Sequence, residues 1–337
     1  MEKINFSDLG RIEAVNRLFE EAGKSFRRGT AFPGMKNGIV RTSSALWIEG
    51  IDFDLTYFPL KHLGYKCVTA AAGELLAILA GPVSLSVRIG VSAKLDYPQI
   101  SEIWSGMVTA AREFGFTCLD LDLGPSRNGL IISVSVTGES DTELENSRKP
   151  GKSKDLICIS GNVGGAYLGM RLLEREKERL QKAGDLSGKM DIDHFRMIVS
   201  AYLKPEINPD ILNALKDSGI TPSYGYLVNR GLADAAKRLS RDSALGVKLY
   251  SDKIPFEGNS FELGRILDVD PVSAAMNGGE DYRLMFVVPM SDYDILRHDF
   301  QSFSIIGHLA KSDVGTVIVM PTGAELPIHA QGWKESE

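Results

Sequence analysis

Three acidic side chains gather at the end of a segment rich in β-forming residues. The segment Ile39–Ile48 runs into Glu49-Gly50, and Asp52 and Asp54 follow directly. If the chain stays extended there, Asp52 and Asp54 point to the same side, because side chains alternate along a strand. Carboxylates grouped in this way could bind a cation, and the more ordinary interpretation is a solvated strand end. The local sequence leaves both interpretations open.

A glycine-rich segment, SGNVGGAYLG, is the second stretch that could do chemistry. It follows a short apolar strand, Leu156–Ser160, and leads into a helix predicted from Ala166 to Ala183. A strand, a glycine loop and a helix in this order can bring backbone N–H groups to an anion. However, the spacing matches neither the phosphate-binding loop nor the dinucleotide fingerprint. The loop therefore indicates either phosphate contact or a turn between two packed elements.

Hydrophobic patterns predict the elements that must position these residues. Leu63–Ala80 carries apolar or small residues on nearly every side, which is typical of a helix buried between layers. Lys24–Gly38 mixes basic residues with glycine and proline and is predicted to be a loop. Further helices are predicted at Ser7–Glu21, Ser101–Phe114, Pro209–Ser218, Leu232–Leu239 and Asp292–Phe300. Further strands are predicted at Val83–Ile89, Thr117–Leu123, Leu130–Val136, Leu284–Val288 and Thr316–Met320.

The length of the chain and one polar stretch predict two domains. A chain of 337 residues with 43% hydrophobic residues is long enough for two cores of ordinary size. Gly138–Lys154 is polar and rich in turn formers, which favours a boundary there. We expect a mixed sheet with helices in residues 1–137, a linker in 138–154, and an α/β domain in 155–337.

Charge and cysteine usage exclude several classes of partner. The formal net charge of -6 argues against nucleic acid or an anionic membrane as the main partner, so a phosphate-bearing substrate needs a local positive patch or a metal. Cys67, Cys118 and Cys158 have neither metal-ligand nor disulfide spacing. The start of the chain has no apolar signal core, and no apolar run reaches about 18 residues. These features predict a cytoplasmic protein with no membrane partner.

Four motifs in consistent order closely resemble those of the thiamine-monophosphate kinase family, which belongs to the aminoimidazole-ribonucleotide-synthetase-related superfamily. They are DFDLTYFPLKHLGYK, SGNVGGAYLG, NGGEDYRL and AQGW, and the resemblance runs from about Asp8 to Trp333. It implies an α/β (α+β), two-domain synthetase-related fold whose N-terminal sheet pairs with its copy in a homodimer. It also implies ATP and Mg²⁺ as cofactors and a small phosphate-bearing ligand, either a nucleotide or a thiamine phosphate.

Most of the family's metal-binding carboxylates are replaced in this chain. The resemblance places the five acidic motifs on Arg27-Arg28-Gly29, on Ala45, on Ala71 and Glu74, on Asp120-Leu121-Asp122-Leu123, and on Leu227-Val228-Asn229-Arg230-Gly231. Asp122 and Glu74 are then the catalytic carboxylates that remain. Asp120 shares a strand face with Asp122, so Asp120, Asp122 and Glu74 are the candidate ligands for Mg²⁺. The longer arm of Glu74 matters because Mg²⁺ requires nearly ideal octahedral geometry.

The resemblance also assigns binding residues, each of which has a structural alternative. Nucleotide contact is assigned to Arg148, Gly161, Asn162 and Gly164. Substrate contact is assigned to Asp52, Glu280, Asp281, Tyr282 and Trp333. Arg148 could instead be a solvated charge, the acidic pair a brace for the following strand, and Trp333 a packing residue of the tail.

Two functions remain open from the sequence, and with them the question of whether the chain is an enzyme. The selective loss of acids favours a family member with lost or much reduced kinase activity that serves in binding or regulation. The alternative is an active but divergent ATP-dependent kinase acting on thiamine monophosphate or another small phosphorylated metabolite. In that case Arg27, Arg28 and Arg230 could replace metal charge with guanidinium groups.

Overall fold

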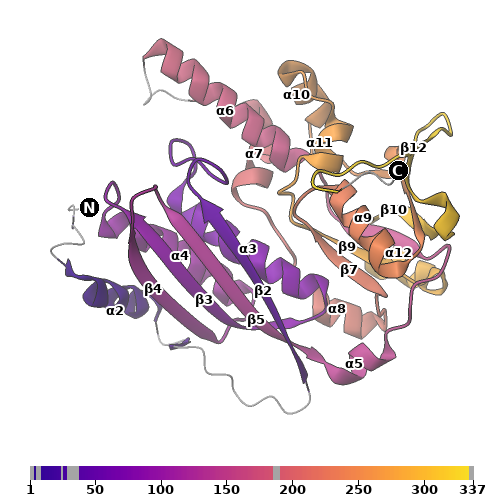
Figure 1. Ribbon diagram of the computed structural model, residues 1–337, viewed down its shortest axis with the longest axis horizontal. Helices are drawn as coiled ribbons and strands as arrows, with labels where there is room; N and C mark the ends of the chain where they lie inside the picture. The colour runs from indigo at the N-terminus through magenta and orange to yellow at the C-terminus, as the bar shows by residue number, and fades with distance from the viewer. Residues whose placement is uncertain (1–3, 5–8, 24–25, 29–37, 185–189, 334–337) are drawn as a thin grey trace. The chain divides into compact units, whose positions relative to one another are not determined.

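The computed structural model describes Ile4 and residues 9–23, 26–28, 38–184 and 190–333. The chain divides into two compact units, Met1–Thr142 (unit 1) and Glu143–Glu337 (unit 2) (Figure 1). Each unit is built on its own β-sheet.

Unit 1 contains a five-stranded mixed sheet with the strand order β1-β4-β3-β5-β2. Strands β1, β4 and β3 are parallel to one another, whereas β5 runs antiparallel to both β3 and β2. The strands are β1 (Arg27–Arg28), β2 (Gly38–Ile48), β3 (Gly81–Ser92), β4 (Cys118–Ser126) and β5 (Ile131–Asp141). The helices are α2 (Arg11–Ala22), α3 (Leu60–Ala77) and α4 (Tyr97–Glu113).

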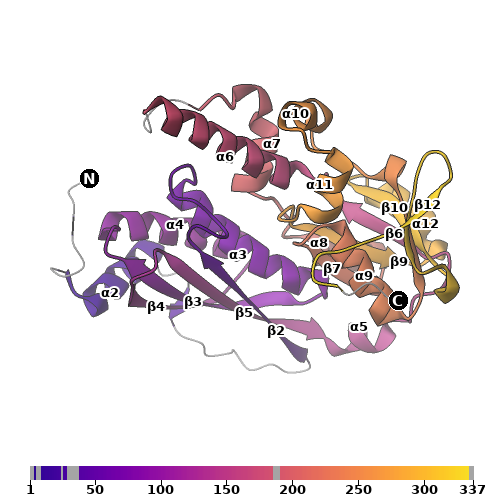
Figure 2. The same cartoon turned by 45° about the horizontal axis from the view of Figure 1, so that its top comes forward.

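Helices α3 and α4 cover one face of this sheet (Figure 2). As predicted, α3 is buried on nearly every side. Two glycines allow α3 and α4 to cross closely: a Cβ at Gly64 would lie 1.9 Å from the carbonyl oxygen of Ile103, and one at Gly106 would lie 1.9 Å from that of Lys61. Larger residues at either position would separate the two helices and open the core of unit 1.

The predicted elements of unit 1 differ from the observed ones mainly at their ends. Within the predicted loop Lys24–Gly38, Arg27 and Arg28 form β1, Gly38 opens β2, and residues 29–37 lie outside the described part. The start of the predicted helix at Ser7 also lies outside it.

Residues 138–154, predicted to be a linker, begin inside regular structure. Strand β5 continues to Asp141 because β2 pairs with it as far as Gly38, and a short helix, α5 (Thr142–Ser147), follows. The polar composition therefore reflects the end of a strand and a short helix, and the connection without regular structure is confined to the residues after Ser147.

Unit 2 contains a seven-stranded sheet with the strand order β12-β11-β8-β10-β6-β9-β7. Among the strands in the described residues of this unit, β8 and β11 form the one parallel pair. The apolar core lies between one face of the sheet and helices α9 and α11. The strands are β6 (Leu156–Ser160), β7 (Tyr224–Val228), β8 (Gly246–Tyr250), β9 (Arg283–Val288), β10 (Phe303–Ala310), β11 (Thr316–Val319) and β12 (Glu325–Pro327). The α-helices are α6 (Gly165–Ala183), α7 (Arg196–Leu203), α8 (Ile211–Ser218), α9 (Leu232–Ser243), α10 (Ser260–Leu267), α11 (Pro271–Asn277) and α12 (Tyr293–Asp299).

Candidate functional site

The two aspartates of β4 lie on the face of the unit 1 sheet that α3 and α4 leave uncovered. Alternation along β4 buries Leu119, Leu121 and Leu123 under the helices and turns Asp120 and Asp122 to the opposite face. Both side chains remain partly exposed to solvent, 25% for Asp120 and 49% for Asp122.

Arginine side chains hold both of these carboxylates. Asp120 lies 2.7 Å from a guanidinium nitrogen of Arg88 on the adjacent strand and accepts a hydrogen bond of 3.1 Å from the Ser86 hydroxyl. Asp122 lies 3.2 Å from a guanidinium nitrogen of Arg11, at the start of α2. The acid pair is therefore already neutralised by two cations of the chain itself.

The described residues do not fit a magnesium site. Glu74 belongs to α3, which packs against the face of the sheet opposite to Asp120 and Asp122, so the three candidate ligands do not meet. Within residues 38–184 and the other described parts, no group of three or more His, Cys, Asp or Glu side chains could hold a metal ion. Magnesium takes oxygen ligands in a tight octahedron, and two carboxylates bonded to guanidinium groups do not supply it.

Leu227, Arg27 and Arg28, which the resemblance aligns with acidic motifs, lie in strands of the fold. Leu227 is fully buried in β7, so this position faces the protein interior. Arg27 and Arg28 pair in parallel with Cys118 and Leu119 through the backbone, and Gly29 lies outside the described part.

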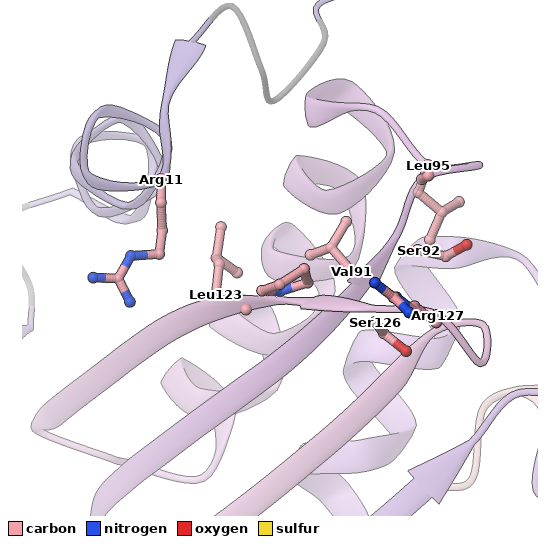
Figure 3. A pocket seen from close by; sticks show the side chains of 10 residues that line it. Arg11, Val91, Ser92, Leu95, Leu123, Ser126 and Arg127 are labelled. Carbon is pink, nitrogen blue, oxygen red and sulfur yellow. The ribbon is translucent and has the colours of Figure 1, made fainter.

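A cavity of about 620 Å³ opens at the carboxyl ends of the parallel strands β3 and β4 (Figure 3). Leu123 and Val91 lie in the middle of the view, with Arg11 to one side of them and Arg127 to the other. Ser92 and Ser126 add hydroxyl groups to its lining. Ligands of open α/β sheets commonly bind beyond the carboxyl ends of parallel strands.

The two arginines that line this cavity differ in whether they form an ion pair with an acid of the chain. Arg11 is engaged by Asp122, whereas the exposed Arg127 makes no ion pair within the described residues. A guanidinium group beside hydroxyl donors is suited to a phosphate or carboxylate. The sequence analysis missed Arg127, which lies between the strands predicted at Thr117–Leu123 and Leu130–Val136; the available signal was a basic residue in a short connection between two strands.

In unit 2 the glycine loop holds a protein carboxylate. Asp281 accepts hydrogen bonds from the backbone N–H groups of Gly164, at 2.8 Å, and of Ala166, at 3.1 Å, at the start of α6. The Asp281 side chain is buried, and this burial raises its pKa to about 7 although the two N–H groups and Arg283 act in the opposite direction. The Asp281 carboxylate therefore accepts the hydrogen bond of the Gly164 N–H group, which the sequence had suggested as a phosphate contact.

Neighbouring backbone contacts fix the shape of this loop. Arg283 donates hydrogen bonds to the carbonyl oxygens of Asn162, at 2.9 Å, and of Glu206, at 2.8 Å. Glu280 and Tyr282 flank Asp281 with positive φ angles of 62° and 49°. Their N–H groups donate to the carbonyls of Asn229 and Val228, respectively. The structure thus brings three motif segments together: 161–165, 228–231 and 278–283.

One glycine at this junction cannot be replaced without strain. Gly231 has a φ of 89°, and a Cβ there would lie 2.3 Å from the carbonyl oxygen of Met276. Both the backbone conformation and the close approach require glycine.

The remaining predicted binding residues also serve the fold. Arg148 is mostly buried and donates to the carbonyl of Pro222 at 3.2 Å. The Trp333 indole N–H donates to Asp234 of α9 at 2.9 Å. Each carboxylate of the first acidic cluster accepts a backbone N–H group: Glu49 from Leu130, Asp52 from Ile48, and Asp54 from Thr56. These contacts give each of these residues a partner within the fold, and Arg148 is not the solvated charge of the alternative interpretation.

Comparisons with known proteins connect this geometry to two groups of relatives. No family model matches the chain. Thiamine-monophosphate kinase of Bacillus subtilis is 19% identical over 293 residues, covering 85% of each chain. A putative hydrogenase expression/formation protein of Methanocaldococcus jannaschii is 24% identical over 287 residues, covering 83% of this chain and 79% of the relative.

Solved structures show the same fold. Thiamine-monophosphate kinase of Aquifex aeolicus superposes with a TM-score of 0.70 at 17% identity, over 96% of this chain and 100% of that one. The hydrogenase maturation protein HypE of Escherichia coli superposes with a TM-score of 0.71 at 15% identity, over 96% and 98%. The predicted resemblance and the two-domain α/β fold are therefore confirmed. Within the described residues, no helix has the length and apolarity needed to cross a membrane.

Proposed function

We propose that this relative of the thiamine-monophosphate kinases binds a phosphate-bearing small molecule but has lost or much reduced kinase activity. One observation carries the proposal: the two acids that remain on β4 form ion pairs with Arg88 and Arg11. Each of these two arginines repels a metal cation and occupies the carboxylate oxygens that would otherwise bind it.

Phosphoryl transfer depends strongly on a metal site. Two anionic groups must approach each other while charge spreads over the transferred group, and metal ions normally neutralise and position them. Every tenfold loss in rate corresponds to only about 1.4 kcal/mol of transition-state stabilisation. Loss of several metal ligands therefore reduces the metal-dependent reaction by many orders of magnitude.

Binding is a separate property and is supported by the cavity of unit 1. Arg127 places positive charge at its edge in a chain whose formal net charge is -6, whereas the charge of Arg11 is already paired with Asp122. Solved relatives include AaThiL complexed with AMPPCP and TMP and a HypE protein in complex with ATP. We propose that the cavity takes the phosphate of a nucleotide or thiamine phosphate, with guanidinium charge in place of the metal.

We also propose that the chain is a cytoplasmic homodimer formed through unit 1. The uncovered face of its sheet is not strongly charged along β2, where Ser44 hydrogen-bonds Ser135 and Leu46 is 54% exposed. Light scattering should give about twice 36.8 kDa. A monomer at micromolar concentration would contradict the dimer.

An assay with thiamine monophosphate and Mg-ATP tests the catalytic part of the proposal. We expect no product above a protein-free control. Turnover of about 0.01 per second or faster would contradict the loss of activity, because kinases typically turn over 1–100 times per second. In parallel, ATP or thiamine monophosphate should raise the melting temperature, since ligands that bind the native state stabilise it. Arg127→Ala should reduce that shift.

The second candidate, an active but divergent ATP-dependent kinase on thiamine monophosphate or another phosphorylated metabolite, has one observation in its favour. Arg11 and Arg127 flank the same cavity, and arginines can stabilise a transferred phosphoryl group. This candidate requires turnover that persists with EDTA and disappears in Arg127→Ala. The first candidate, a chain that has lost kinase activity, instead predicts ligand binding without turnover.

A further inference from the structure

A second cavity, of about 980 Å³, lies in unit 2 and contains none of the residues discussed above for phosphate binding. Its floor is the sheet face that points away from the apolar core, along β10, β6 and the end of β8. Phe303, Ile305 and His308 line it, whereas Ile306 points into the core. A β-bulge between Ile305 and Gly307 shifts the alternation by one residue, so that Ile305 and His308, although three residues apart, lie on the same face.

Aromatic side chains form much of this floor. The rings of Tyr250 and His308 are stacked with centroids 5.7 Å apart, and the Tyr250 hydroxyl lies 3.3 Å from His308 Nδ1. Tyr293 and Phe303 line the same space. Burial, together with nearby Lys248, lowers the pKa of His308, so its ring is neutral at neutral pH. The floor thus offers flat surfaces and neutral hydrogen-bonding groups to an aromatic ring.

The rim carries positive charge. Lys154, Lys253 and Arg297 line the cavity together with a single acid, Asp252, which pairs with Lys253 at 3.5 Å. In the described parts of the chain, neither Lys154 nor Arg297 forms an ion pair, and both are exposed. Two uncompensated cations at one opening are distinctive in a chain of net charge -6. They favour an anionic ligand.

A buried carboxylate holds two parts of the rim in place. Asp155 accepts hydrogen bonds from the backbone N–H groups of Lys152, at 2.7 Å, and of Met290, at 3.2 Å. Lys154 between them has a φ of 81° and donates its N–H group to the carbonyl of Leu309 at 2.7 Å. Backbone strain of this kind persists where surrounding contacts fix it, often at ligand-binding positions. The backbone that carries Lys154 is therefore fixed before a ligand arrives.

We propose that this cavity is a binding site for a small molecule with a flat aromatic ring and a phosphate or carboxylate group. The ring lies over Tyr250 and His308, and the anion is held by Lys154 and Arg297. The cavity lies within the size range of small-molecule sites, about 300–1,000 Å³. The site is separate from the cavity at the carboxyl ends of β3 and β4, since all of its lining residues belong to unit 2.

Calorimetric titration of the full chain with AMP, adenosine and inorganic phosphate tests this proposal. Titrations in an Arg127→Glu background remove the contribution of the unit 1 cavity. We expect AMP to bind at least about tenfold more tightly than adenosine or phosphate alone, because ring and anion contribute together. Arg297→Glu, added to that background, should weaken AMP binding at least about tenfold. Arg265→Glu is the matched control, since it reverses the charge of an exposed arginine on α10 and should leave AMP binding unchanged.

Three results would overturn the site. The first is no AMP binding in the Arg127→Glu background. The second is equal affinity for AMP and adenosine, which would remove the role of the rim cations. The third is equal weakening by Arg297→Glu and Arg265→Glu, which would show a general effect of charge. Tyr250→Leu gives an independent check: it should weaken adenosine and AMP alike while leaving the affinity for phosphate unchanged.

Discussion

Unit 1 and unit 2 each contain carboxylates that the sequence suggests for phosphate chemistry, but the two units use them differently. Asp281 in unit 2 is 3% exposed and is bound by backbone N–H groups at the start of α6. Asp120 and Asp122 in unit 1 are partly exposed and are bound by arginine side chains. A buried carboxylate with backbone partners is part of the framework of the fold. An exposed carboxylate with side-chain partners leaves the fold largely independent of it.

The largest effect should come from removing the buried carboxylate. Asp281→Ala leaves two buried N–H groups without acceptors, and we expect the free energy of unfolding to fall by about 3–5 kcal/mol. Urea denaturation followed by circular dichroism measures this change. Asp120→Ala is the control and should change stability by less than about 1 kcal/mol. Equal losses in the two variants would remove the distinction between the two regions.

The pH dependence of stability provides a second test. The pKa of Asp281 rises from 3.8 to about 7 on folding, so between these values the native state keeps a proton that the unfolded state has lost. Stability should therefore fall as pH rises through this window, by at most about 4 kcal/mol at 1.36 kcal/mol per pH unit. Denaturation of the wild type and of Asp281→Asn at pH 4.5 and 7.5 isolates this contribution. An identical pH dependence in both proteins would show that Asp281 does not titrate in this range.

A pair of glycines tests whether the backbone is equally constrained in the two regions. Gly231→Ala places a Cβ against the carbonyl of Met276 at a φ of 89°, and we expect a loss of about 2–3 kcal/mol. Gly124→Ala, at the edge of the unit 1 cavity, meets no atom within 4 Å. It should change stability by less than about 1 kcal/mol. Thermal unfolding of both variants measures the contrast, and a tolerant Gly231 would mean that the junction in unit 2 can relax.

The smallest effect concerns the ion pair between Arg11 and Asp122. Both side chains are exposed, 60% and 49%, so their coupling energy in a double-mutant cycle should be below about 1 kcal/mol and should shrink further in 1 M salt. The variants Arg11→Ala, Asp122→Ala and their combination supply the cycle. A coupling of several kcal/mol would place Asp122 with Asp281 among the structural carboxylates.

Most helices and strands with a clear pattern were predictable from the sequence. Strand β6 was predicted with its observed bounds, and α3 and α6 were predicted within a few residues of theirs. Strands β7, β8, β10 and β12 and helices α7, α10 and α11 were missed. The sequence of β10, FSIIGHLA, does not alternate over its whole length, because the bulge shifts the alternation by one residue. Such a strand is recognised only from its pairing with β6 and β8.

The binding residues were less predictable than the fold. Residues 161–164, Asn229, Arg230 and Glu280–Tyr282 do come together, but Asp281 fills the helix N-terminus that the glycine loop offered. Arg148 and Trp333 are tied to Pro222 and Asp234, respectively. None of these partners is close in sequence, so local patterns could not decide between a binding role and a structural role.

The sequence by itself determined that Asp120 and Asp122 share one face of β4, because side chains alternate along a strand whatever surrounds it. Only the tertiary structure decided what that face does. Arg88 reaches Asp120 because β3 lies beside β4 in parallel register, and Arg11 reaches Asp122 although it lies 111 residues earlier in the chain. The same holds for Asp281 and Ala166, which are 115 residues apart. The alternation of side chains along a strand depends only on residues that are close in the sequence. The partner that compensates a charge depends on which distant segments the packing brings within hydrogen-bonding distance.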